Sequence, residues 1–536
     1  MGDSQQNPKV GVSSRQRLKD TIAQLCDEIR ALYLSDYSPW VVGYSGGKDS
    51  TATLQLIWTA IRGLGSAERT KPIHVISTDT LVENPVVAMW VAKSLETMAR
   101  AAQDEHIPIE THRLMPEVND SFWVNLIGRG YPAPRHKFRW CTERLKIKPS
   151  NTFIQSLVNN YGDTILVLGT RKAESQVRAS RMQRLEEGRV RERLSPNESL
   201  PGCSVYTPIE DWSNDEVWAF LTQWDNPWGY DNHQLLTMYQ GASPDGECPL
   251  VVDLSTPSCG DSRFGCWVCT VVGEDKSMKA MVKNDQEKDW MMPLLRIRNA
   301  LDPGKDKGKK DREKRDFRRI SGLVQVDLGN DPDNLRRREP RLVPGPYLQP
   351  VREDLLRKLL TAQKLIRRNP EAPEGVKEIE LISLEQLQEI RRIWVEDKHE
   401  IEDRLPAIYR EVTGKEFPDS DAYAGRLFRE EELKILEQLC RKPDGGFDRL
   451  HYELIRELLD VQESYRTAAR RSGLFKAIED AFEKCFYDDE VDALNRAVLR
   501  HRARHPDMQF PDTQPSLFNG LDARAKNEEE APAFRK

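Results

Sequence analysis

The segment 40–50 restricts the fold of this chain more than any other. A mostly apolar run at 40–44 is followed directly by Ser-Gly-Gly-Lys-Asp-Ser at 45–50, and apolar residues then recur at helical spacing over 54–64. This order predicts a buried strand, a glycine loop and a helix in direct succession. The backbone N–H groups of such a loop can approach phosphate oxygens, and the helix dipole favours negative charge there. The segment therefore predicts a phosphate-binding loop.

The spacing within this loop limits the classes of phosphate-binding protein to which the chain can belong. It differs from Gly-x-x-x-x-Gly-Lys-Ser/Thr, because Asp49 occupies the hydroxyl position, and this disfavours a Walker-type NTPase. A solvent-exposed Gly-Gly turn is the alternative to a phosphate loop. Lys48 would add a positive charge beside the phosphates. The predicted ATP-binding residues of this segment are Tyr44, Ser45, Gly46, Gly47, Lys48, Asp49 and Ser50.

Two further apolar runs, at 73–76 and 165–168, predict strands that each end in polar residues. Strands separated by helical stretches imply a parallel sheet, and such sheets bind ligands at the carboxyl ends of their strands. Asp79, Thr80 and Gly169 are therefore predicted to join the loop in binding ATP. Asp79 could hold Mg²⁺, since magnesium prefers carboxylate and phosphate oxygens; a helix cap or a surface position is the alternative.

A basic and aromatic segment at 135–149 predicts contact with an anionic substrate that carries a stackable base, although a solvated basic helix face is the alternative. Cys141 lies among these cations, which are expected to depress its thiol pKa and make it a sulfur carrier; otherwise it is a small buried hydrophobe. The predicted substrate-binding residues are Arg139, Arg144, Lys146, Arg171 and Lys172. The predicted catalytic residues are Lys48, Asp49, Cys141 and Arg171.

The chain has nine cysteines, and the eight other than Cys141 fall into two kinds. Four lie in a loop rich in glycine and proline, and four thiolates at such spacing suit either a [4Fe-4S] cluster or tetrahedral zinc, with free thiols as the third possibility. The predicted metal ligands are Cys248, Cys259, Cys266 and Cys269. The predicted packing residues are Cys26, Cys203, Cys440 and Cys485.

Residue order at three places resembles one family. The loop 45–50 matches in full the PP-loop of ATP pyrophosphatases, which include phosphoadenosine phosphosulfate (PAPS) reductases, sulfate adenylyltransferase small subunits and tRNA-thiolating enzymes. Segments 139–149 and 169–175 resemble Arg-Trp-Cys-Thr-x-x-Leu-Lys-Ile-x-Pro and Gly-x-Arg-x-x-Glu-Ser of its PAPS reductase-like branch. A fourth element, at 79–85, matches in part, with Leu81 in place of a glycine. The resemblance implies an adenine nucleotide alpha hydrolase-like fold that binds ATP at the loop, adenylylation of an oxygen, and contact between Arg171 and an anion.

The combination of this loop, the cysteine cluster and a helical C-terminal part resembles the DndC family of bacterial DNA phosphorothioation, over residues 20–290. The resemblance implies replacement of a non-bridging oxygen of the DNA backbone phosphate by sulfur. It also implies DNA, a cysteine desulfurase and other Dnd proteins as partners. ATP, Mg²⁺ and a [4Fe-4S] cluster are the expected cofactors. A sulfonucleotide reductase and a non-catalytic, ATP-dependent assembly subunit are the alternatives.

The length of 536 residues is too great for one core and predicts several domains. We expect an α/β domain at 1–300, built on a parallel sheet flanked by helices and including the cysteine-rich loop 248–269. A basic connector at 301–350, a helical domain at 351–523 and a disordered tail at 524–536 should follow.

The charge and hydropathy of the chain bear on its partners. The net charge of -6 argues against a uniformly basic coat for nucleic acid. The basic segments 305–319 and 336–338 could nevertheless track DNA phosphates, with a solvated connector as the alternative. No segment resembles a signal peptide or a membrane span, so we expect a cytoplasmic protein without a membrane partner.

Overall fold

The computed structural model describes residues 14–135, 138–187, 193–242, 265–302, 309–327, 340–423, 430–466 and 471–504. These residues form two compact units. The first comprises Met1–Lys305, Pro350–Trp394 and Asp403–Asp421. The second comprises Asp306–Gln349, Val395–Glu402 and Ala422–Lys536. The single helical domain expected at 351–523 is therefore divided between the two units.

The first unit is built on a six-stranded sheet with the order β3-β2-β1-β4-β6-β5. The strands are β1 (Trp40–Gly43), β2 (Ile73–Thr78), β3 (Ile109–Leu114), β4 (Thr164–Val167), β5 (Ser195–Pro196) and β6 (Cys203–Tyr206). All neighbouring strands pair in parallel except β5 and β6. The three strands expected from apolar runs are β1, β2 and β4, and the expected α/β fold with a mostly parallel sheet is confirmed.

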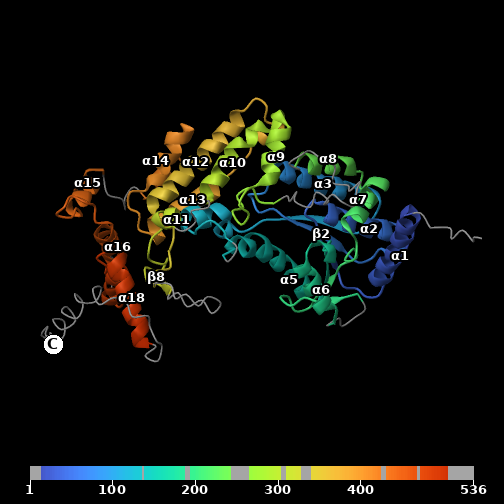
Figure 1. The fold of residues 1–536 in the computed structure, drawn as a ribbon, viewed down its shortest axis with the longest axis horizontal. Helices are drawn as coiled ribbons and strands as arrows, with labels where there is room; N and C mark the ends of the chain where they lie inside the picture. The colour runs from blue at the N-terminus through green and yellow to red at the C-terminus, as the bar shows by residue number, and fades with distance from the viewer. Residues whose placement is uncertain are drawn as a thin grey trace, which may run out of the picture. The chain divides into compact units, whose positions relative to one another are not determined.

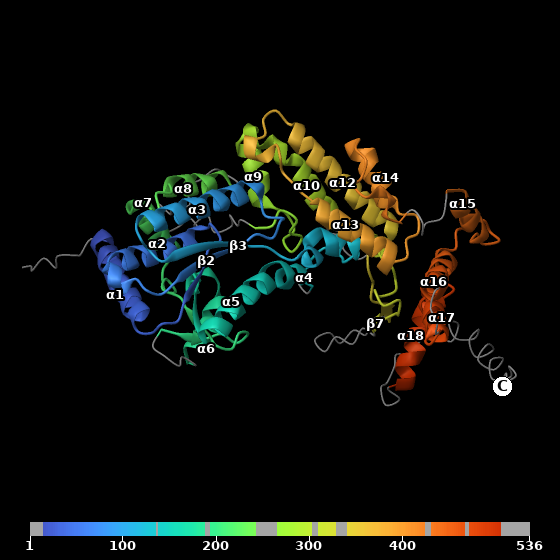
Figure 2. The same ribbon diagram turned by 180° about the vertical axis from the view of Figure 1, so that it is seen from behind.

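Helices cover both faces of this sheet, as a parallel sheet buried on both sides requires. One face carries α1 (Ser14–Leu34), α2 (Lys48–Arg62), α3 (Pro85–Asp104), α7 (Asn214–Gln223) and α8 (Asn232–Gly241), which share one large apolar core. The opposite face carries α5 (Lys148–Tyr161) over a smaller core. Figure 1 shows α3 and α8 on one side of the sheet, with α5 and α6 (Gln176–Glu187) on the other. The view from behind in Figure 2 shows the same two layers.

Helices from the middle of the chain complete the first unit. They are α9 (Lys276–Asn284), α10 (Met292–Leu301), α12 (Gln349–Arg368), α13 (Leu384–Arg392) and α14 (Arg404–Thr413). A capping box opens α13, because the side chains of Ser383 and Gln386 each accept a hydrogen bond from the other's backbone N–H group. The buried Trp394 that follows α13 donates its indole N–H to the Ile127 carbonyl at 3.0 Å. That bond ties the middle of the chain to a segment that follows β3.

The second unit is mainly helical. Its elements are α11 (Lys309–Glu313), β7 (Val326–Asp327), β8 (Arg341–Leu342), α15 (Glu430–Leu439), α16 (Arg449–Arg466), α17 (Leu474–Cys485) and α18 (Glu490–Arg504). In the part of the expected basic connector that is described, two arginines have structural partners. Arg318 is buried between Asp316 and Glu453, and Arg315 donates to the Gly345 carbonyl at 2.7 Å. These two side chains therefore hold the unit together, and do not form the expected solvated or DNA-tracking segment. Residues 336–338 lie outside the described residues.

Among the described residues, no helix combines the length and the apolar character needed to cross a membrane.

Candidate nucleotide and thiol site

A cavity of about 1110 Å³ opens at the carboxyl ends of β1, β2 and β4. Its volume lies slightly above the range of about 300–1,000 Å³ that is common for ligand pockets. The predicted ATP-binding residues that line it are Tyr44, Ser45, Gly47, Lys48, Asp49, Ser50, Asp79 and Gly169. Gly46 and Thr80 do not line it. The sheet therefore brings together most of the residues that the sequence placed at three separate strand ends.

The glycine loop turns tightly before α2. Gly46 has a φ of 72°, in the left-handed region, and a Cβ there would lie 2.4 Å from Val91 Cγ2. The hydroxyl of Ser50 accepts from the Ser45 N–H at 3.2 Å and donates to the Gly47 carbonyl at 3.0 Å. Gly47 caps α2 without a side-chain hydrogen bond. The first turn of α2 therefore faces the cavity without a side-chain cap, as an anion-binding helix end requires.

Asp49 is held by two cations. Its Oδ1 accepts from Arg171 Nε at 2.7 Å, and its Oδ2 lies 3.2 Å from Lys48 Nζ. Arg171 is only 3% exposed and also donates to the Trp212 carbonyl at 3.1 Å. Arg171 also lines the cavity, so its predicted contact with an anion stays a prediction, and its hydrogen bonds orient Asp49 at the cavity wall.

The end of β4 approaches the loop closely. A Cβ on Gly169 would lie 2.7 Å from the Asp49 carbonyl oxygen and 2.9 Å from Thr53 Oγ1. Real Cβ atoms do not tolerate such distances to a backbone atom, so this position requires glycine.

Asp79 lies at the end of β2, where its carboxylate accepts from Arg113 Nε at 3.0 Å and from the Leu81 N–H at 2.8 Å. Leu81, which stands where the PP-loop family has glycine, has a φ of 63°. The backbone thus keeps the left-handed turn that glycine favours, although a leucine there carries strain of about 1–2 kcal/mol.

A cysteine turn packs against the residues that follow β2. The backbone of residue 266 forms an isolated antiparallel bridge with that of residue 83, and the Trp267 N–H donates to the Val82 carbonyl at 2.9 Å. Cys266 Sγ lies 3.3 Å from Thr80 Oγ1 and 3.6 Å from Glu83 Oε1. Glu83 also lines the cavity and pairs with Lys146 at 3.2 Å. The thiol of Cys266 therefore contacts a residue, Glu83, that forms part of the cavity wall.

The pKa values of the thiols are set mainly by burial. Burial and the charge of Glu83 raise the pKa of Cys266 to about 12, despite the opposing charge of Lys146. Burial also raises the pKa of Cys141, and the charge of Cys269 adds to this. The expectation that neighbouring cations depress the pKa of Cys141 is therefore wrong, because removal of the thiol from water raises its pKa and outweighs the hydrogen bonds from Thr142 that would lower it. Both thiols are protonated at neutral pH until a metal ion or a base takes the proton.

Three predicted substrate-binding residues do not line the cavity. Arg144 donates to Asp120 Oδ1 at 2.6 Å, and Lys172 pairs with Glu186 at 2.7 Å and with Asp211 at 2.9 Å. Arg139 is an exposed residue next to α4 (Trp140–Thr142). Lys146 does line the cavity. Of the four predicted metal ligands, Cys248 and Cys259 lie outside the described residues.

Sequence reasoning missed several residues of the site. Tyr239 in α8 places its hydroxyl 3.4 Å from the Lys48 N–H, with Lys48 Nζ 5.6 Å from its ring centroid. Arg113 at the end of β3 holds Asp79. No local motif marks Tyr239, because it reaches the loop only through the packing of α8. Arg113 could have been predicted from its place near the carboxyl end of β3, if that polar strand had been recognised in the sequence.

Part of the chain is similar to known proteins. Residues 39–271 match the family model of the phosphoadenosine phosphosulfate reductase domain. An uncharacterized protein of Methanocaldococcus jannaschii is 31% identical over 201 residues, which cover 37% of this chain and 35% of that protein. The chain therefore spans about a third of that relative.

Solved structures with similar parts include three kinds of protein. PAPS reductase of Candida auris is 16% identical, covering 42% of this chain and 92% of its own, with a TM-score of 0.26. The U34-tRNA thiolase of Methanococcus maripaludis with its [4Fe-4S] cluster is 14% identical, covering 53% and 80%, with a TM-score of 0.25. FMN adenylyltransferase of Candida glabrata is 11% identical, covering 48% and 78%, with a TM-score of 0.25. The similarity of residues 39–271 to the PAPS reductase domain rests on the family model.

Proposed function

We propose that this protein is a DNA phosphorothioation sulfurtransferase that splits ATP into AMP and pyrophosphate. The proposal rests on the contact between the Cys266 thiol and Glu83, because Glu83 forms part of the wall of the PP-loop cavity. A nucleotide site beside a thiol suits a reaction in which ATP activates an oxygen and sulfur replaces it. The similarity of residues 39–271 to the PAPS reductase domain supports a site for an adenine nucleotide.

The reaction balances without a redox partner when sulfur arrives as sulfide. A non-bridging oxygen of the DNA phosphate attacks the α-phosphorus of ATP, and pyrophosphate leaves. Hydrosulfide then attacks the DNA phosphorus, the P–O bond to the adenylate breaks, and AMP leaves. The sum is one DNA phosphate, one ATP and one hydrosulfide converted to one phosphorothioate, AMP and pyrophosphate. Persulfide sulfur from a cysteine desulfurase must first be reduced to sulfide by a thiol.

The residues of the cavity divide this work. Lys48 and the loop amides stabilise the charge that develops on pyrophosphate, and Asp79 would hold Mg²⁺. Arg171 orients Asp49 and keeps the loop in shape. Lys146 and Arg178, which both line the cavity, would contact the acceptor phosphate.

The cysteine turn suits a sulfur-handling group. Cys266 and Cys269 form a Cys-x-x-Cys turn, with Cys141 close enough for the charge of Cys269 to act on it. Thiolates of this kind would hold a [4Fe-4S] cluster together with Cys248 and Cys259, and a bound cluster would supply a place to hold sulfide.

The test uses the full chain purified without oxygen, with α-labelled ATP, duplex DNA, and a cysteine desulfurase with cysteine and a thiol. The wild type should form AMP and phosphorothioate in equal amounts. Lys48→Ala should lower both by about 10²–10³-fold, as the loss of one charge-stabilising group does in other enzymes. Lys93→Ala, on the exposed side of α3, is the matched control and should leave both unchanged. Full sulfur incorporation by Lys48→Ala would mean that another component performs the chemistry.

A second candidate, a sulfonucleotide reductase, is favoured by the family match alone. It predicts sulfite release from a sulfonucleotide in the presence of thioredoxin and without DNA. The sulfurtransferase predicts no sulfite under those conditions. Cys266→Ser separates the steps further, because it should still exchange pyrophosphate into ATP in the presence of DNA but should incorporate no sulfur.

A further inference from the structure

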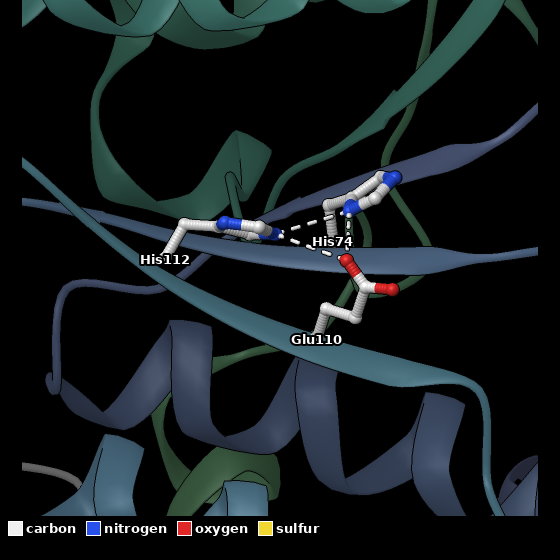
Figure 3. A group of neighbouring side chains, drawn as sticks. All are labelled: His74, Glu110 and His112. Carbon is white, nitrogen blue, oxygen red and sulfur yellow. Dashed lines mark hydrogen bonds and ion pairs between the residues drawn. The ribbon is translucent and has the colours of Figure 1, made fainter.

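Three potential metal ligands converge at the edge of the sheet, away from the nucleotide cavity. They are His74 in β2 and both Glu110 and His112 in β3, as Figure 3 shows. The parallel register pairs His74 with Glu110, and His112 follows Glu110 by two residues. Side chains two residues apart on a strand point to the same face of a sheet. The three side chains are therefore positioned by two paired strands, β2 and β3, and not by a loop.

The distances between the three ligand atoms suit a transition metal ion. His74 Nδ1 lies 3.1 Å from His112 Nε2, and Glu110 Oε2 lies 3.4 Å from the first and 3.7 Å from the second. A point equidistant from three atoms so spaced lies about 2.0 Å from each, which is the usual length of zinc bonds to histidine nitrogen and to carboxylate oxygen.

Hydrogen bonds alone satisfy this group poorly. Each neutral imidazole carries one N–H and one lone pair, and the carboxylate carries only lone pairs. The two contacts to Glu110 are longer than ordinary hydrogen bonds. Within the described part of the chain, the buried His74 Nε2 has no hydrogen-bond partner. Without a metal ion, one ring donates to the other across the 3.1 Å contact. A cation bound by all three lone pairs would replace that hydrogen bond and leave the imidazole protons on the outer nitrogens.

The surroundings hold the two imidazole rings in place on the sheet. Phe153 of α5 packs against the two rings at 5.8 and 4.7 Å between centroids. Glu110 is 63% exposed at its side chain, which leaves a side open for a water ligand. Imidazole nitrogen with one carboxylate oxygen favours Zn²⁺, Co²⁺, Ni²⁺ or Cu²⁺ over Mg²⁺ or Ca²⁺.

We propose that His74, Glu110 and His112 bind a divalent transition metal ion, Zn²⁺ in the first place, which clamps β2 to β3. None of the three lines the nucleotide cavity, whose nearest wall residue on the same face of β2 is Ile76. The site is therefore independent of the proposed function. Its expected effect is on the stability of β2 and β3, which bring Asp79 and Arg113 to the cavity.

The test is Co²⁺ titration of the full chain carrying Cys266→Ser and Cys269→Ser, followed by visible absorption. This background removes two thiolates that would also bind Co²⁺. We expect one equivalent of Co²⁺ with nitrogen and oxygen ligands, no thiolate charge-transfer band, displacement by Zn²⁺, and a higher melting temperature with the metal. Adding His112→Ala should weaken binding by more than about 100-fold, since it removes a direct ligand, which matters more than a supporting contact. His233→Ala, an exposed histidine of α8, is the matched control.

Glu110→Gln is the second variant, because it removes the charged ligand at an exposed side chain and leaves the fold intact. It should weaken Co²⁺ binding at an unchanged melting temperature of the metal-free protein. Absence of a nitrogen-ligated Co²⁺ spectrum, or the same spectrum and affinity in His112→Ala, would overturn the proposal. The three residues would then be a hydrogen-bonded group only.

Discussion

The Asp49 carbonyl lies so close to Gly169 that no side chain fits between them. This contact joins the end of β4 to the first turn of α2, and Arg171 reinforces it from two residues further along the chain. The glycine loop is therefore shaped by contacts from a strand more than 100 residues away in sequence. Small changes at these contacts should act on nucleotide binding before they act on the fold as a whole.

Gly169→Ala should weaken ATP binding at least about tenfold and lower the melting temperature, because overpacking against a backbone atom costs about 1–3 kcal/mol. Isothermal titration with a non-hydrolysable ATP analogue measures the first effect. Gly241→Ala is the matched control, because a Cβ there meets nothing within 4 Å. Unchanged affinity in Gly169→Ala would show that the loop does not depend on this approach.

Single residues also show how much of the site could be predicted from the sequence. The loop 45–50, Asp79 and Gly169 were predicted from motifs, and all but Gly46 and Thr80 of the predicted nucleotide ligands line the cavity. Arg144 and Lys172 were predicted to bind the substrate because they are positively charged. In the structure, Arg144 is paired with Asp120 and Lys172 with Glu186. A sequence gives the sign of a charge and not its partner. That is why the cations were predicted less well than the glycines.

At the scale of elements, the strands that contain mostly apolar runs (β1, β2 and β4) were predicted, and the polar β3 was not. Its sequence Ile-Glu-Thr-His-Arg-Leu has partly exposed side chains, because it is the edge strand of the sheet. The docking of the cysteine turn beyond β2 could not be predicted either, since its backbone bonds join residues more than 180 positions apart. Helix α6 presents arginines at three-residue spacing, of which Arg178 lines the cavity.

These arginines give a test of DNA binding. Arg181 and Arg184 are both 65% exposed at their side chains and share Glu198 as a partner. The double variant Arg181→Ala, Arg184→Ala should weaken duplex binding and reduce the slope of log affinity against log salt by about 1–2, because each phosphate contact contributes about 0.9. Fluorescence anisotropy at several salt concentrations measures both.

The control for this test is Arg100→Ala, which removes an exposed arginine of α3, on the opposite side of the sheet from α6 (Figure 1). ATP binding should be the same in the wild type and in both variants. An unchanged salt slope in the double variant would exclude α6 from the DNA-binding surface.

At the scale of the whole molecule, the chain forms two units, and its middle helices belong to the first. Composition predicted several domains but not this division, because similar amphipathic helices serve both units. The second unit depends on a buried ionic group. Asp316 accepts from Arg318 at 2.8 Å and from Arg449 at 2.6 Å, and Glu453 contacts both arginines.

Asp316→Asn should destabilise the second unit by about 3 kcal/mol, because it leaves buried arginines with less compensating charge. Burial alone would raise the pKa of Asp316, but the hydrogen bonds and charges of Arg318 and Arg449 hold it well below its usual 3.8. The wild type should therefore keep this stabilisation above pH 3.8, and lose it as the pH falls from there through the lower pKa of the folded state. Hydrogen exchange of α16 and α18 measures the effect.

The control for the second unit is Asp480→Asn, which changes an exposed carboxylate of α17 and should leave exchange unchanged. ATP binding by the first unit should be unaffected in Asp316→Asn. Equal exchange in the two variants would show that the buried group contributes nothing to stability.

The central claim is that the PP-loop splits ATP between the α- and β-phosphates to activate a DNA phosphate for sulfur. The most direct measurement is product analysis of α-labelled ATP with the oxygen-free full chain, DNA and a sulfide source. We predict AMP and pyrophosphate in equal amounts, one phosphorothioate for each AMP, and loss of all three in Lys48→Ala. ADP and phosphate as products, or phosphorothioate formed without AMP, would contradict the account.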